Sequence, residues 1–206
     1  MTLSTLHSEK LTHLPAIWAR MRRGAHLHPG DGELYYALRA EPEHYAAAFA
    51  LFGLRLIDHP AQFFYLEGDE SLKAVTERRA ELMALAFVLI DSANTAGQTF
   101  GEAFFPAAPI PRKPSDFNLF RTQQHREVLS AAGIKDNTGA ERTFRFMARL
   151  GMVRYELGSV TFLLPFYRMR DVCLQISKLG EEGLDQLAAT AATTDTEQEQ
   201  ETEDEA

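Results

Sequence analysis

The residues that could carry chemistry are few, and they do not form a catalytic set. His26 and His28 lie in a Pro-Gly loop close to Asp31, with His13 as a further candidate, and this is the grouping nearest to a metal site. Histidines in such loops are more often surface residues than ligands, so we interpret them as surface residues. The single cysteine, Cys173, lies on the apolar face of a helical stretch, where a packed thiol is expected.

Common catalytic and cofactor motifs are absent from the sequence. It has no Gly-rich phosphate loop ending in Lys-Ser or Lys-Thr, no GxGxxG after a strand, no GxSxG and no HExxH. One cysteine excludes an internal disulfide and a multi-cysteine zinc site. We therefore expect a binding protein rather than an enzyme, with no cofactor and no metal.

A row of arginines is the strongest chemical signal, and it lies in the stretch from Gly139 to Leu164. On a helical wheel of about 100° per residue, Arg145 and Arg149 fall within roughly 60° of Arg142. Arg154 follows the helix. Because arginine binds nucleic-acid phosphates without reading sequence, we predict that these four residues contact DNA. A solvated basic face is the alternative interpretation.

The elements that would position these arginines are a helix, a glycine stop and a hairpin. Gly151 follows the helix at the position where glycine adopts the left-handed conformation that ends helices. Beyond it, β-branched and aromatic residues at 152–157 and 160–164 flank Gly158-Ser159, a two-residue hairpin signal.

A weaker copy of this arrangement lies nearer the N-terminus. A helix over 43–52 ends at Gly53, and strands over 54–57 and 63–66 follow with a turn between them. A helix that leads through glycine into a hairpin is typical of the third helix and wing of a winged-helix domain. Any helix-to-hairpin junction in an α+β protein could give the same pattern once. Two copies predict a mostly helical α+β protein with tandem winged-helix domains, each of three helices plus a hairpin.

Helical patterns precede each copy and place its other elements. We expect helices over 11–24 and 33–39 in the first copy. In the second we expect a helix over 69–95 and, after a Pro-rich connection, one over 119–132 capped by Asp116. Phe100, Phe104 and Phe105 in that connection should dock on the protein's own core.

Three regions follow from these patterns. Residues 1–70 are predicted to form the first winged-helix domain. Residues 71–180 form the second, with a Pro-rich insertion near 98–116 and a C-terminal helix over 167–179. Residues 181–206 are an acidic tail with little to bury and should be largely disordered.

Apolar residues on two helices indicate protein contacts. The helix over 43–52 has no Lys or Arg, so Tyr45, Phe49 and Phe52 are predicted to be core or protein-interface residues. The centre of the helix over 69–95 is apolar on all sides and must be buried, by its own domain or by a second subunit. The residues we assign to that interface are Leu82, Leu85 and Leu89.

The charge of the chain is unevenly distributed. The formal net charge is −8, but residues 1–180 carry a net charge of +2 because the end of the chain holds ten acidic residues and no basic ones. Residues 112–180 carry +6 and residues 1–111 carry −4. We expect the basic half to meet polyanions and the acidic half to meet proteins. The longest apolar run is nine residues, against about twenty for a membrane span, so we expect no membrane association and a cytoplasmic protein.

Particular motifs in the first half resemble a known family. The segments are LHPGDGELYYAL at 27–38, FGLRL at 52–56 and FFYL at 63–66. They resemble MksE, the MukE-like subunit of the bacterial MksBEF condensin, over about residues 11–179. The acidic tail is not part of the family pattern.

The resemblance implies a kleisin-interacting tandem winged-helix (KITE) protein with no catalytic activity of its own. Such a protein forms a homodimer, binds the kleisin MksF and is linked through it to the SMC-like ATPase MksB. It also implies contact with DNA, weak and independent of sequence, and a nucleoid-associated location. The role would be in chromosome condensation and segregation or in plasmid defence.

A winged-helix transcription regulator is the alternative interpretation. It would bind one operator tightly and selectively as an isolated protein, and a footprint at one promoter would favour it. The third helix of the first copy, over 43–52, lacks basic residues, which counts against it.

Overall fold

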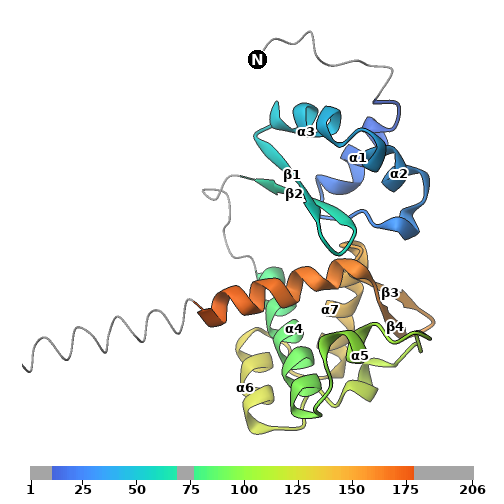
Figure 1. The fold of residues 1–206 in the computed structure, drawn as a ribbon. Helices are drawn as coiled ribbons and strands as arrows, with labels where there is room; N and C mark the ends of the chain where they lie inside the picture. Colours follow the sequence, from blue (N-terminus) through green and yellow to red (C-terminus); the bar gives the residue numbers. More distant parts are fainter. Residues whose placement is uncertain (1–10, 69–76, 179–206) are drawn as a thin grey trace, which may run out of the picture. The chain divides into compact units, whose positions relative to one another are not determined.

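The computed structural model describes residues 11–68 and 77–178 (Figure 1). They are mostly helical, with two small antiparallel sheets of two strands each, so the predicted α+β class is confirmed. The start of the helix predicted over 69–95 and the acidic tail at 181–206 lie outside the described residues.

Three short helices form the first part of the described chain: α1 (Leu14–Met21), α2 (Glu33–Ala40) and α3 (Pro42–Ala50). Proline lies in the first turn of α1 and of α3, where its missing N–H would have no helical partner in any case. After α3 the chain reaches Gly53 with φ +68°, which confirms the predicted glycine stop.

A hairpin follows α3. Strand β1 (Leu54–His59) pairs antiparallel with β2 (Phe63–Gly68), and His59 faces Phe63 at the closed end. Gln62 adopts φ +62° in the connecting loop. The segment between α1 and α2 adds a third partner, because Leu27 exchanges two backbone hydrogen bonds with Phe64, of 3.0 and 2.8 Å.

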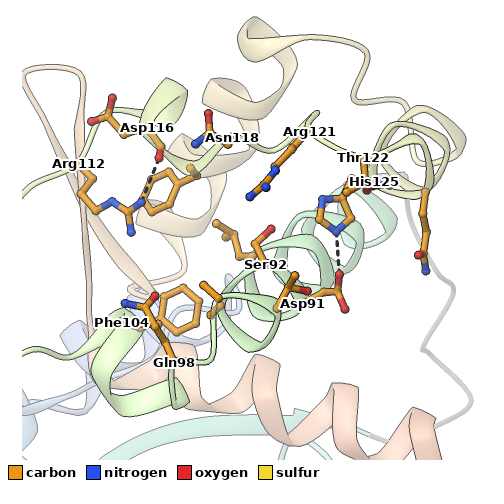
Figure 2. A pocket seen from close by; sticks show the side chains of 17 residues that line it. Asp91, Ser92, Gln98, Phe104, Arg112, Asp116, Asn118, Arg121, Thr122 and His125 are labelled. Atoms are coloured by element: carbon orange, nitrogen blue, oxygen red, sulfur yellow. Dashed lines mark hydrogen bonds and ion pairs between the residues drawn. The ribbon is translucent and has the colours of Figure 1, made fainter.

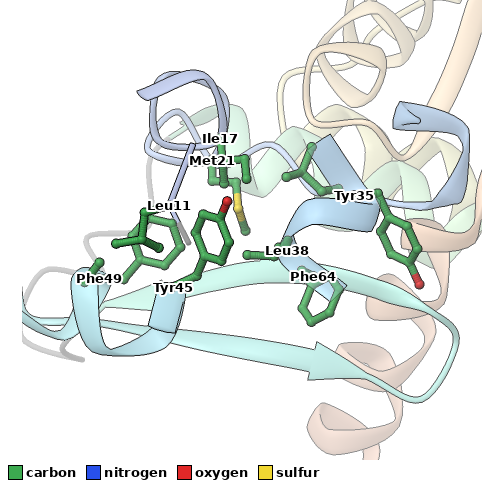
Figure 3. Packing of buried hydrophobic residues seen from close by; sticks show 10 residues of the cluster. Leu11, Ile17, Met21, Tyr35, Leu38, Tyr45, Phe49 and Phe64 are labelled. Atoms are coloured by element: carbon green, nitrogen blue, oxygen red, sulfur yellow. The ribbon is translucent and has the colours of Figure 1, made fainter. Parts of the chain in front are cut away.

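A single apolar cluster lies between these helices and the hairpin (Figure 3). Its members come from α1, α2, α3 and the strands, so no one element can bury its apolar face alone. Removing each large side chain from water contributes roughly 1.5–3 kcal/mol. The largest fully buried members are Ile17, Met21, Leu27, Leu38, Tyr45, Phe49 and Phe64.

The chain from α4 onward repeats the order of elements seen in the first part, helices followed by a hairpin. Helix α4 (Glu77–Thr95) packs against both α6 (Gln123–Ala131) and α7 (Asn137–Arg149). The predicted start at 119 is wrong: the chain forms the 3-10 turn η5 (Pro114–Phe117), and Thr122 caps α6. Asp116 lies too far before α6 to cap it, and its carboxylate instead accepts the backbone N–H of Lys113, at 2.8 Å.

The Pro-rich connection contains a short helix that the sequence analysis does not predict. Helix α5 (Phe100–Phe104) begins with a capping box, in which Thr99 and Glu102 satisfy each other's backbone N–H groups. The Phe104 ring is 4.7 Å from that of Phe162 and is 5% exposed. The predicted docking of this aromatic segment on the protein's own core is therefore confirmed for Phe104.

A second hairpin follows α7. Gly151 has φ +74°, and the chain turns there into β3 (Val153–Glu156), which pairs with β4 (Ser159–Phe162). The turn is Leu157-Gly158, one residue earlier than predicted, and both residues have positive φ, as a type I′ turn requires. Arg112 exchanges backbone hydrogen bonds with Val160, just as Leu27 does with Phe64 in the first hairpin.

Residues 168–178 belong to a second compact unit. The chain is helical over 167–178, which confirms the predicted C-terminal helix as far as the structure describes it. Burial raises the pKa of the Cys173 thiol in this helix, as expected for an unreactive packed thiol.

Candidate functional site

The arginines of α7 are exposed, but two of them are already paired with carboxylates. Arg142 donates from Nη2 to Glu81 Oε1 of α4 at 2.8 Å, and the Glu81 side chain is 9% exposed. Arg145 donates to Glu141 Oε1, one turn earlier on α7, at 2.6 Å. A nearby carboxylate offsets the charge that a guanidinium presents to a phosphate. The predicted DNA-binding residues therefore differ in how closely a carboxylate approaches the guanidinium group.

Tyr155 of β3 strengthens the second of these pairs. Its hydroxyl donates to Glu141 Oε1 at 2.6 Å, and the Arg145 guanidinium lies 5.4 Å from its ring centroid. The hydrogen bond from Tyr155, followed by that from Arg145, lowers the pKa of Glu141. Burial, followed by the bond to Glu141, raises the pKa of Tyr155. Glu141 is thus held ionised and ties β3 to α7.

Arg149 and Arg154 are more accessible. Arg149 is the last residue of α7, is exposed, and lies over the Phe146 ring at 5.5 Å. Arg154 is exposed on β3, with its Nε 3.8 Å from Glu156 Oε1, beyond hydrogen-bonding distance. Within residues 11–68 and 77–178, Arg149 has no carboxylate partner. These two offer the most available positive charge of the predicted four.

The aromatic residues of α3 and its end separate into core and surface. Tyr45 and Phe49 are fully buried in the cluster of the same chain, so their side chains are not available to a partner. Phe52 is 64% exposed and stacks on Trp18 with 4.8 Å between ring centroids. Its neighbour Leu51 is 60% exposed. Phe52 is thus the member of the predicted set that is placed for a protein contact.

The apolar centre of α4 faces inward. Leu85 is fully buried, and Leu82 and Leu89 are no more than 6% exposed. Phe87 on the same helix is 39% exposed. The leucines therefore fill the interior of the chain, and their role in a subunit interface stays a prediction.

The prediction that the loop histidines lie at the surface is wrong for His26. That residue is 1% exposed, and its backbone N–H and its ring Nδ1–H both donate to the carbonyl oxygen of Leu150, at 2.9 and 2.8 Å. His28 caps the short turn η3 (Pro29–Asp31), where its Nδ1 accepts the backbone N–H of Gly30 at 3.1 Å. Both imidazole rings thus form hydrogen bonds within the chain. No group of three or more His, Cys, Asp or Glu residues within 11–68 and 77–178 could hold a metal ion.

Electrostatics connect His28 to the second hairpin. Burial is the largest influence on the pKa of His28 and lowers it. The carboxylate of Asp31 opposes this effect, whereas the positive charges of Arg20 and Arg154 lower the pKa further. Because Arg154 belongs to β3, this strand lies close enough to the α1–α2 segment for its charge to act there.

A pocket of about 600 Å³ opens beside α4, α5, η5 and α6 (Figure 2). Its apolar lining includes Leu89, Phe104 and Phe117. The guanidinium of Arg112 lies over the Phe117 ring at 4.2 Å and donates to the carbonyl oxygen of Asp116 at 3.1 Å. Its other polar lining residues include Asp91, Ser92, Gln98, Asn118, Arg121, Thr122 and His125.

The pocket contains a histidine–carboxylate pair that the sequence analysis does not find. His125 donates from Nε2 to Asp91 Oδ2 at 2.8 Å. Such a pair supports general-base catalysis when the other ring nitrogen faces a nucleophile. Here Nδ1 is buried without a hydrogen-bond partner in the described part of the chain, so no hydroxyl is poised for attack. The pair links α6 to α4. Its two residues are 34 positions apart and belong to none of the motifs searched for, so sequence inspection does not find it.

None of the helices that the structure describes is long and apolar enough to span a lipid bilayer.

Residues 12–174 match the family model described as condensin complex protein MksE. The match covers most of the chain, including both hairpins, the arginines of α7 and the exposed end of α3. It confirms the resemblance seen in the sequence motifs. A search of curated proteins found no match.

Proposed function

Because the chain belongs to the MksE family of condensin complex proteins, we propose that it is a non-catalytic accessory subunit of an SMC-like condensin. In this role it dimerises and binds the kleisin MksF, which connects it to the ATPase MksB. The complex acts in chromosome organisation and segregation or in plasmid defence, in the cytoplasm and at the nucleoid. The observation that carries this proposal is the family match over residues 12–174.

The repeated order of elements supports a tandem winged-helix architecture. In each half, three main helices precede a hairpin, and the segment leading to the second of them bridges to the hairpin's second strand. The bridging pairs are Leu27 with Phe64 and Arg112 with Val160. A bridge of this kind is the short third strand expected beside a wing. We retain 1–70, 71–180 and 181–206 as the proposed division of the chain.

The exposed end of α3 is the proposed protein contact. Phe52, Leu51 and the adjoining Trp18 form an apolar surface, and large exposed aromatic residues of this kind often anchor protein interfaces. Loss of the Phe52 ring should weaken association with a partner subunit while leaving the fold intact.

Weak, sequence-independent DNA binding is proposed for the second half. The arginines of α7 and β3 lie at the surface of a region with a net charge of +6, which favours contact with phosphates. Arg142 and Arg145 should contribute less than Arg149 and Arg154, because their carboxylate partners lie at 2.8 and 2.6 Å, whereas Glu156 lies 3.8 Å from Arg154.

Affinity purification from the native host, followed by mass spectrometry, tests the proposed function. Recovery of a kleisin and an SMC-like ATPase with the tagged chain is the expected result. Light scattering of the purified chain should give the mass of a dimer. Absence of both partners under gentle, low-salt conditions would contradict the assignment.

A further inference from the structure

The ends of α1 and α7 are held together by a buried contact. The carbonyl oxygen of Leu150, directly after α7, accepts both the backbone N–H and the ring Nδ1–H of His26. Two glycines permit the close approach. A Cβ on Gly151 would lie 3.1 Å from the carbonyl oxygen of His26, and one on Gly24 would lie 3.4 Å from the Leu150 side chain. The segment after α1 therefore runs beside the segment after α7.

This contact brings together two segments that each carry arginines and are far apart in sequence. Arg22 and Arg23 follow α1 directly before Gly24, while Arg149 ends α7 and Arg154 lies on β3. We call Arg22, Arg23, Arg149 and Arg154 the junction arginines. All four are exposed, and the charge of Arg154 acts on His28, which places it near the first half independently of the hydrogen bonds.

The junction arginines are poorly neutralised. In the described part of the chain, Arg22, Arg23 and Arg149 have no carboxylate partner. Arg154 has only a long ion pair, with its Nε 3.8 Å from Glu156 Oε1, and both side chains are exposed. Arg20, in the last turn of α1, is paired with Asp31. Unpaired guanidinium groups retain the charge and the donors that a phosphate requires.

The surroundings of the junction favour a nucleic acid over a protein. The centre of a protein interface is usually apolar, and none of the large exposed apolar residues lies within 20–28 or 149–154. In the first half such residues are Tyr36, Leu51 and Phe52, and in the second half Leu157 is exposed at the β3–β4 turn. The junction thus presents charge without an apolar centre.

We propose that the junction arginines form one phosphate-binding surface for duplex DNA, shared by both halves of the chain. This inference rests on the proposed DNA contact and changes the set of residues that make it. Arg22 and Arg23 of the acidic half join the site. The paired Arg142 and Arg145 contribute less to binding. Contacts with phosphates alone make the binding independent of sequence and dependent on salt.

The test compares two double variants of the full-length chain that lose the same charge. R22A/R23A removes two junction arginines, whereas R39A/R55A removes two arginines of the same half that are paired with Asp58 and Glu67. Binding to a labelled, mixed-sequence DNA duplex is measured by fluorescence anisotropy over a range of salt concentrations. We expect R22A/R23A to raise the Kd about tenfold and to reduce the slope of log K against log salt by about 2, because each phosphate contact contributes about 0.9 to that slope. The control should stay close to wild type.

Equal effects of the two double variants, or no binding by the wild-type chain at low salt, would overturn the inference. Kleisin capture by the same proteins distinguishes it from the proposed function. Normal capture with unchanged DNA binding in R22A/R23A rejects the junction surface and leaves the function standing. Loss of capture in R22A/R23A with unchanged DNA binding identifies a protein contact and equally rejects the DNA surface.

Discussion

The two helices that lead into hairpins, α3 and α7, share a backbone arrangement and display opposite surfaces. Beyond α3 the chain exposes Leu51 and Phe52, and the helix has no Lys or Arg. Along α7 the exposed side carries Arg142, Arg145 and Arg149. Because packing constrains only the inward side of each helix, the outward side of the same arrangement can serve different partners.

The glycines that end the two helices have the same backbone conformation but different surroundings. Gly53 and Gly151 have similar φ angles, +68° and +74°. A Cβ on Gly53 would meet nothing within 4 Å, whereas one on Gly151 would press on the backbone of His26. The first glycine only turns the chain. The second also allows the two halves to touch.

Substitutions of Phe49 and Phe52 give the largest expected contrast within one half. F49A should reduce the free energy of unfolding by about 3–5 kcal/mol, because it empties a fully buried site. F52A should change it by less than about 1 kcal/mol, since the ring is mostly exposed. Urea unfolding measures both. F52A should also weaken kleisin capture, and wild-type capture by F52A would remove Phe52 from the proposed interface.

Alanine at the two glycine stops compares the halves directly. G53A should cost about 1 kcal/mol, the penalty for a left-handed conformation. G151A should cost about 2–4 kcal/mol, because overpacking against His26 is added to that penalty. Unfolding midpoints in urea give the difference. Equal losses in the two variants would mean that the close approach at Gly151 contributes nothing.

Release of the paired arginines should strengthen DNA binding. E141Q removes the carboxylate partner of Arg145, leaving its guanidinium free to bind phosphate. We expect the Kd for a DNA duplex to fall by about two- to fivefold at low salt. E43Q, which removes one negative charge from α3 instead, is the matched control. A similar gain in both variants would show that net charge alone is responsible.

The smallest expected effect concerns His28 and checks the contact between the halves. Its pKa in the folded chain lies below the ordinary 6.5, chiefly through burial. The unfolded chain therefore binds more protons, so this residue's contribution to stability is present above about pH 6.5 and is lost as the pH falls below it. NMR titration should show the lowered pKa, and R154A should raise it. No change in R154A would contradict the closeness of β3 to His28.

Local signals made several elements predictable. Both glycine stops, both hairpins and the first-turn proline of α3 involve residues within a few positions of one another, so sequence inspection finds them. The errors are also local. The α6 cap is Thr122 and not Asp116, because the chain first forms the 3-10 turn η5 and the helix starts only at Gln123. The type I′ turn took Leu157 in place of Ser159, although non-glycine residues rarely adopt a positive φ.

The candidate sites were less predictable because their accessibility depends on distant residues. The helical wheel finds the arginine face, but it cannot show that Glu81, 61 residues earlier, neutralises Arg142. Likewise, Tyr45, Phe49 and Phe52 are all aromatic, and only the tertiary packing shows that the first two are buried in the apolar cluster and the third is exposed.

By itself, the sequence determined the helical and hairpin elements, the contrast in charge between the halves and the family, because these depend on composition, short spacings and motifs. Tertiary structure decided which charges remain available. His26 and Leu150, 124 positions apart, form a buried hydrogen bond that brings the segment after α1, which carries Arg22 and Arg23, to the end of α7, which carries Arg149. Coulomb energy depends on distance in space, and a linear sequence does not contain that distance.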